Sequence, residues 1–152
     1  MTSLEIFGSP ILSHKELLAI ADLICSEEDP FHRYQISLAC VESAEMEYYN
    51  KLYRGKAGTT DVLSFVGAEL DPGKEIGRNN TDETALPLRN CDIIIDIKQL
   101  YSQKGIRTIE EEFRTVFIHG LLHLVGYDHI RQRDKEKMEE KEEYYKNQPG
   151  ED

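Results

Sequence analysis

Hydrophobic and polar positions follow two kinds of pattern along the chain, one typical of strands and one typical of helices. Short apolar or alternating runs predict strands at residues 4–7, 34–40, 61–66 and 91–96. Apolar residues three and four apart predict helices at about 13–25, from 43 to 55, from 96 to 105, from 108 onward and at about 134–146. This order predicts a single α+β domain over residues 1–152, with a mixed sheet of about four strands surrounded by helices.

Specific residues mark where these predicted helices begin and end. Ser13 followed by Glu16, and Thr108 followed by Glu111, are capping-box sequences that open helices. Gly55 can adopt the left-handed conformation that ends a helix. Residues 71–90 form a connection of about 20 residues, a length at which a loop is usually functional or disordered. An acidic, polar tail is expected after about residue 146.

The helix that begins at Thr108 carries the candidate chemistry. His119 and His123 are four residues apart and therefore project from one helix face, while apolar residues cover nearly all the rest, so the helix is predicted to be buried. Gly126 would let the chain turn so that His129 returns as a third ligand. Three imidazoles with an open fourth position are typical of a catalytic zinc site. We therefore expect one Zn²⁺ ion, although nickel, copper or iron would also suit these ligands.

The spacing of the histidines equals that of the metzincin proteases, His-Glu-x-x-His-x-x-Gly-x-x-His. Gly120 stands where those enzymes have the glutamate that acts as general base. Peptide hydrolysis by that mechanism would lack its base, so the ligand set is shared without the chemistry. Asp128 either orients a ligand imidazole through a hydrogen bond or is a turn residue.

The composition of the chain limits the kinds of function and location that it can have. The chain is 39% hydrophobic and 31% charged, with a net charge of -11, which argues against broad electrostatic binding of nucleic acid but not against a local basic site for RNA. No stretch approaches the roughly 20 apolar residues of a membrane span. Because the first ten residues lack a secretory pattern and Cys25, Cys40 and Cys91 look like buried core thiols, we expect a cytoplasmic protein.

Residues His119 to His129 read His-Gly-Leu-Leu-His-Leu-Val-Gly-Tyr-Asp-His and resemble the signature of the YbeY endoribonucleases. A second resemblance is Asn50-x-x-Tyr53-Arg54-Gly55 followed by Thr60-Asp61-Val62-Leu63-Ser64-Phe65, and a weaker third is Asp92-Ile93-Ile94-Ile95. Together they cover roughly residues 35 to 145. The chain has Thr59 and Val66 where the family usually has proline, and Cys91 where glycine is usual, but no proposed ligand is affected.

The resemblance implies a zinc-dependent, single-strand-specific endoribonuclease. Its expected role is maturation of the 3′ end of small-subunit ribosomal RNA and ribosome quality control, with the small subunit and its assembly factors as partners. The resemblance also implies that Arg54 and His119 are catalytic, and Lys56 is a further candidate for binding substrate phosphate. Two alternatives remain: a zinc metalloprotease-like hydrolase of unknown substrate, and a non-catalytic, metal-stabilised ribosome assembly factor.

Overall fold

A computed structural model describes the chain except for residues 1, 56–57, 59, 71–85, 129–130 and 149–152. The described strands form one mixed sheet in the order β1-β2-β4-β3, in which β1 and β4 run parallel to β2 and β3 runs antiparallel to β4. The strands are β1 (Thr2–Phe7), β2 (Arg33–Val41), β3 (Val62–Leu70) and β4 (Leu88–Asp96). The helices are α1 (His14–Glu28), α2 (Ser43–Arg54), α3 (Ile97–Gln103), α4 (Ile109–Leu124) and α5 (Gln132–Lys146). The expected α+β fold is confirmed.

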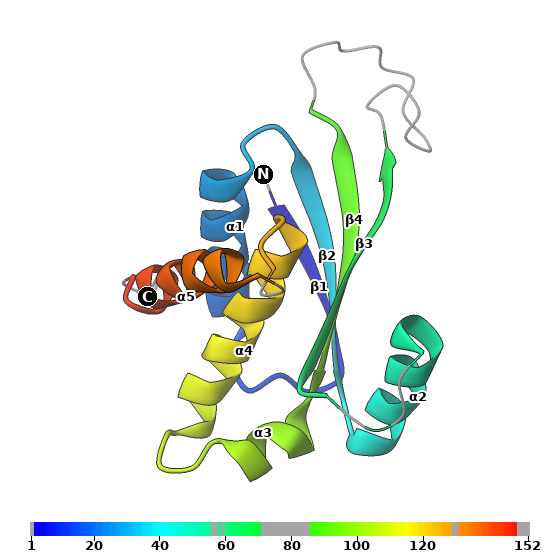
Figure 1. Ribbon diagram of the computed structural model, residues 1–152. Helices are drawn as coiled ribbons and strands as arrows, with labels where there is room; N and C mark the ends of the chain where they lie inside the picture. The colour runs from blue at the N-terminus through cyan, green and yellow to red at the C-terminus, as the bar shows by residue number, and fades with distance from the viewer. Residues whose placement is uncertain (1, 56–57, 59, 71–85, 129–130, 149–152) are drawn as a thin grey trace.

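The helices cover the two faces of the sheet unequally (Figure 1). α1, α4 and α5 lie on one face and bury the main core, whereas α2 lies against the other face over a smaller cluster. Successive side chains of a strand point to opposite faces. Ile93 and Ile95 of the central strand β4 therefore enter the main core, and Ile94 enters the cluster under α2. Burial on both sides explains the uninterrupted apolar run in this strand.

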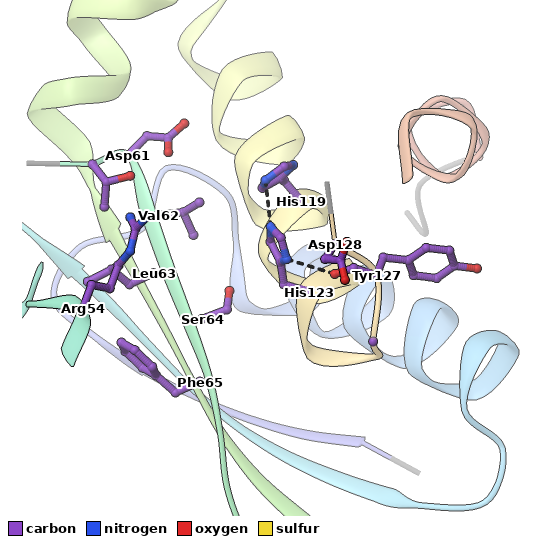
Figure 2. Close-up of a pocket in the computed structure, with 12 residues that line it drawn as sticks. Arg54, Asp61, Val62, Leu63, Ser64, Phe65, His119, His123, Tyr127 and Asp128 are labelled. Carbon is purple, nitrogen blue, oxygen red and sulfur yellow. Dashed lines mark hydrogen bonds between the residues drawn. The ribbon is translucent and has the colours of Figure 1, made fainter. Parts of the chain in front are cut away.

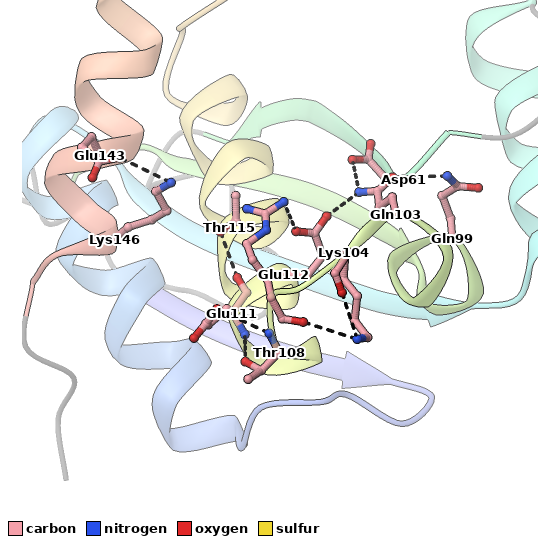
Figure 3. Close-up of polar contacts among 12 residues, drawn as sticks. Asp61, Gln99, Gln103, Lys104, Thr108, Glu111, Glu112, Thr115, Glu143 and Lys146 are labelled. Carbon is pink, nitrogen blue, oxygen red and sulfur yellow. Dashed lines mark hydrogen bonds and ion pairs between the residues drawn. The ribbon is translucent and has the colours of Figure 1, made fainter.

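Both predicted capping-box sequences open helices, but only the Thr108–Glu111 pair forms both hydrogen bonds of the box. Thr108 Oγ1 accepts a hydrogen bond from the Glu111 amide at 3.1 Å, and the Glu111 carboxylate accepts one from the Thr108 amide at 3.4 Å (Figure 3). Ser13 accepts from the Glu16 amide at 3.2 Å. The carboxylate of Glu16 instead lies 3.5 Å from the Arg114 guanidinium, because α4 packs beside α1.

Several element ends differ from the expectation. β4 begins at Leu88, so residues 88–90, expected in the long connection, belong to a strand. Their backbone pairs with β2 on one side and β3 on the other, and this pairing extends the strand beyond its apolar run. α1 continues to Glu28, and α5 begins at Gln132. Residues 71–85 of the predicted long connection lie outside the described residues.

β1 and β3 also run further than expected, from Thr2 and to Leu70 respectively, whereas the expected end of α2 is confirmed. α2 ends at Gly55, whose φ of 67° is left-handed. All three cysteines are free thiols, with Cys25 and Cys91 buried and Cys40 half-buried. Within the described ranges, none of the helices combines the length and the apolarity needed to cross a membrane.

Candidate functional site

A cleft of about 670 Å³ lies between the end of α2, the first half of β3 and the C-terminal end of α4 (Figure 2). Its described lining is Arg54, Thr60, Asp61, Val62, Leu63, Ser64, Phe65, His119, His123, Gly126, Tyr127 and Asp128. The tertiary structure thus brings four sequence-predicted residues, Arg54, His119, His123 and Asp128, to one cleft. The other two predicted site residues, Lys56 and His129, lie outside the described residues.

The histidines face the cleft because α4 approaches β3 closely at Gly120. Ser64 Oγ donates a hydrogen bond to the Gly120 carbonyl at 3.0 Å. A Cβ atom at this position would lie 3.0 Å from Ser64 Oγ and 3.2 Å from Val62 Cγ2, closer than ordinary van der Waals contact. The position that holds the general base in metzincins is therefore filled by the strand, and the cleft has no room there for a glutamate without displacing Val62 or Ser64.

His119 and His123 turn the same ring atom toward each other. Their Nε2 atoms are 3.1 Å apart (Figure 2), and the ring centroids are 4.7 Å apart. His123 Nδ1 donates to the Tyr127 carbonyl at 3.0 Å, and His119 Nδ1 contacts the Glu142 carboxylate. Because both acceptors favour a proton on Nδ1, each neutral imidazole points its Nε2 lone pair at the other. Two acceptor nitrogens turned toward one point are an arrangement that a bound cation would satisfy.

The spacing of the two nitrogens suits a metal ion. Nitrogen ligands lie about 2.0–2.1 Å from zinc in tetrahedral geometry, which puts two such nitrogens roughly 3.3 Å apart. Among the described residues, no group of three histidine, cysteine or carboxylate side chains converges closely enough to hold a metal. The third predicted ligand, His129, is not one of the described residues, so the described part of the site supplies two imidazoles.

Glu142 is a residue that sequence reasoning missed. It belongs to α5, which lies beside α4, and its side chain is 19% exposed. A signal for it was present, because Glu142 follows Met138 by four residues and precedes Tyr145 by three, and both of these neighbours are buried. A carboxylate on the apolar stripe of an amphipathic helix indicates a specific partner inside the protein.

The turn after α4 is anchored by a second glutamate, Glu28 of α1. Gly126 has a φ of 109°, and Tyr127 then donates its hydroxyl to Glu28 at 2.6 Å. Burial, together with this hydrogen bond, raises the pKa of Tyr127 to about 12. Burial also acts to raise the pKa of Glu28, but hydrogen bonds from Tyr127, Tyr145 and Lys141 outweigh it and leave this pKa below its ordinary value.

The opposite wall of the cleft supplies charge and an aromatic face. Arg54, the last residue of α2, lies across the cleft from the histidines (Figure 2). Gln103 Nε2 donates one hydrogen bond to Asp61 Oδ2 at 3.1 Å and another to Oε2 of the buried Glu112 at 2.7 Å (Figure 3). Phe65 packs on Tyr53 with ring centroids 4.6 Å apart. The wall therefore combines a cation, a fixed carboxylate and the half-buried ring of Phe65.

The chain is similar to proteins of one family over most of its length. A family model described as endoribonuclease YbeY matches residues 11–150. A protein named endoribonuclease YbeY from Halalkalibacterium halodurans is 35% identical over 107 residues, which cover 69% of this chain and 65% of that protein. One of the same name from Rhodococcus opacus is 30% identical over 129 residues, which cover 84% of this chain and 69% of that protein.

The likeness extends to the fold. The solution structure of TM1509 from Thermotoga maritima aligns with a TM-score of 0.55 at 23% identity, over 96% of this chain and 87% of that chain. The sequence match spans 65% of the length of the relative from Halalkalibacterium halodurans. Because the family model covers nearly the whole chain, including the segments that form both walls of the cleft, the chain belongs to the endoribonuclease YbeY family.

Proposed function

We propose that the chain is a zinc-dependent, single-strand-specific endoribonuclease that acts in the maturation of small-subunit ribosomal RNA and in ribosome quality control. The observation that carries the proposal is the pair of imidazole nitrogens, 3.1 Å apart, in a cleft that Arg54 also lines. Family membership supports RNA as the substrate. The ribosomal small subunit and its assembly factors would be the partners, and the cytoplasm the location.

The charge of the cleft supports a bound dication. The described charged residues of its lining are Arg54, Asp61 and Asp128, so the lining is negative by one unit while the histidines are neutral. A phosphodiester would be repelled by that charge. One divalent cation reverses the sign and makes the cleft suitable for an RNA phosphate.

His119, His123 and, by the sequence pattern, His129 would hold the ion. Zinc in such a site supplies Lewis acidity, which polarises a phosphate oxygen or lowers the pKa of a water molecule to about 7. Arg54 would donate hydrogen bonds to the phosphoryl oxygens and neutralise the charge that develops on them. Lys56 would add a phosphate contact close to Arg54 in the sequence.

The aromatic wall supports a single-stranded substrate. Unpaired bases stack on aromatic side chains, whereas the bases of a duplex are already stacked on each other. Phe65 lies in the cleft lining near Arg54, where a base next to the bound phosphate could reach it. The close packing of Gly120 on Ser64 argues against the protease alternative, because the glutamate base of that mechanism would have to displace Val62 or Ser64.

The test compares cleavage of one RNA sequence in single-stranded and duplex form by purified protein, with zinc content measured in every sample. We expect wild type to hold about one zinc ion per chain and to cut the single strand. Arg54→Ala should keep zinc and lose about 100-fold or more in rate, as when one charge-stabilising donor is removed. His119→Ala should lose both zinc and cleavage.

Arg133→Ala is the matched control, because Arg133 is an exposed arginine on α5 outside the cleft lining. It should cut like wild type. Equal cleavage by wild type, Arg54→Ala and His119→Ala would sink the enzyme proposal. Folded Arg54→Ala and His119→Ala proteins that still support ribosomal RNA processing in cells would favour the non-catalytic assembly factor.

A further inference from the structure

α5 brings a carboxylate to the outer side of His119, away from the cleft. Glu142 Oε1 contacts His119 Nδ1, and the side chains are 19% and 31% exposed respectively. Met138 and Tyr145, on the same face of α5, are buried and only 1% and 4% exposed. The carboxylate therefore sits on the packed face of the helix, and its position is set by the docking of α5 on α4 (Figure 1).

This contact determines which nitrogen of His119 carries the proton. A neutral imidazole has one N–H and one lone pair, and the hydrogen bond made by one nitrogen selects the role of the other. A carboxylate at Nδ1 accepts the N–H there, so the lone pair lies on Nε2. Nε2 is the atom that faces His123 at 3.1 Å inside the cleft.

The helix that carries Glu142 is itself tied to the turn that orients His123. Glu28 accepts hydrogen bonds from the hydroxyls of Tyr127 and Tyr145, and it pairs with Lys141 of α5 at 3.1 Å. The Tyr127 carbonyl in turn accepts from His123 Nδ1. The Glu28 carboxylate thus connects the turn whose Tyr127 carbonyl holds His123 Nδ1 with α5, the helix whose Glu142 carboxylate contacts His119 Nδ1.

We propose that Glu142 is a positioning residue, which holds His119 with its Nε2 lone pair directed into the cleft and so prepares that nitrogen to bind the metal. This inference rests on the proposed metal site. Carboxylates that accept from the outer N–H of a ligand histidine fix its ring orientation and make it more basic, and their loss typically weakens metal binding about 10- to 100-fold.

A purely structural role for Glu142 makes a different prediction. If the contact only fastened α5 to α4, its removal would lower stability and leave the tautomer of His119 unchanged. The tautomer is measured on the metal-free protein by long-range ¹H–¹⁵N correlation of the imidazole ring. A pH of about 8 keeps an ordinary histidine neutral, because its usual pKa is about 6.5.

The experiment compares wild type, Glu142→Ala and Glu142→Gln, with Glu139→Gln as the matched control because Glu139 is an exposed glutamate on α5. Zinc affinity is measured by competition with a chromophoric chelator. We expect His119 of wild type to be the Nδ1–H tautomer. In Glu142→Ala it should shift toward Nε2–H, with zinc affinity reduced about 10- to 100-fold.

Glu142→Gln keeps an acceptor oxygen at the same place, so it should keep the Nδ1–H tautomer and lose less affinity than Glu142→Ala. If the alanine variant does not fold, wild type alone still tests the proposal, because an Nε2–H tautomer of His119 in wild type would overturn it. An unchanged tautomer in folded Glu142→Ala overturns it as well. Failure of wild type to bind zinc would instead refute the proposed metal site, and the tautomer would still decide the role of Glu142.

Discussion

At the residue scale, the carboxylates of Glu28 and Glu142 hold groups of the cleft in place. Glu28 is only 10% exposed, yet hydrogen bonds keep the pKa of its carboxyl below the ordinary value of 4.5 in spite of its burial. The charge is tolerated because two tyrosine hydroxyls and a lysine surround it. The same logic applies to Glu142, whose carboxylate faces an imidazole nitrogen. These two partly buried carboxylates therefore lie where they orient groups of the cleft.

A lowered pKa makes Glu28 a source of pH-dependent stability. The unfolded chain binds a proton at Glu28 near pH 4.5, whereas the folded chain does so only at lower pH, so this contribution is complete above pH 4.5 and is lost as pH falls through the folded pKa. Glu28→Gln should lower the free energy of unfolding by about 2 kcal/mol at neutral pH. It should also flatten the decline below pH 4.5, as measured by urea denaturation at several pH values.

Part of the acid slope should remain in the Glu28→Gln variant, because the pKa of Asp29 is also lowered: burial acts to raise it, but hydrogen bonds from Tyr34 and His32 outweigh that effect. Glu139→Gln, on the exposed face of α5, should stay within about 0.5 kcal/mol of wild type at every pH. A variant at Glu28 that kept the full wild-type slope would show that the Tyr127–Tyr145 network does not depend on the charge.

Among the elements, α4 does the most to position the site. Its first turn is fixed by the Thr108–Glu111 capping box, its middle is buried in the main core, and its last two turns present the histidines. Gly120 lets this end of the helix approach β3. The strand supplies the opposite wall of the cleft only because the helix lies this close, so the packing of α4 on β3 defines the cleft.

Loss of the cap should weaken α4 from its N-terminus. Thr108→Ala removes the acceptor for the Glu111 amide and should lower the free energy of unfolding by about 1 kcal/mol. Thr115→Ala makes the same substitution inside the same helix and removes only the hydrogen bond from the Thr115 hydroxyl to the Glu111 carbonyl at 2.9 Å. Alanine is the better helix former, so the free energy of unfolding should stay within about 0.5 kcal/mol of wild type. Chemical denaturation of both variants checks the pair, and equal effects would contradict the role of the cap.

At the scale of the whole molecule, a net charge of -11 opposes broad binding of RNA to the surface, so the proposed substrate needs a local site. The three acidic runs near residues 27–29, 110–112 and 134–143 lie on α1, α4 and α5. Arg54 lies at the end of α2, on the other side of the sheet from α1 and α5 (Figure 1). RNA would therefore be recognised at a few contacts and not along an extended basic surface.

This charge distribution predicts a weak dependence of RNA affinity on salt. Each phosphate contact of a single strand adds about 0.7 to the slope of log affinity against log salt. We expect a small slope for a single-stranded RNA, and Arg54→Ala should reduce its magnitude by about 0.7. Arg133→Ala should not change it. Fluorescence anisotropy at several salt concentrations measures the slope, and a slope equivalent to six or more contacts would contradict recognition confined to the cleft.

The sequence by itself determined the order of the elements, the capped start of α4 and the end of α2 at Gly55, and the spacing of its histidines predicted the site. These features depend on contacts between residues near each other in the chain, so a local pattern carries them. It could not identify the partners of Glu142 and Glu28, which are 23 and 99 residues away, nor the extension of β4 to Leu88. Only the tertiary structure decided that Glu142 holds His119 and that Glu28 holds the turn at Tyr127, because long-range packing selects among many acidic side chains that look alike in sequence.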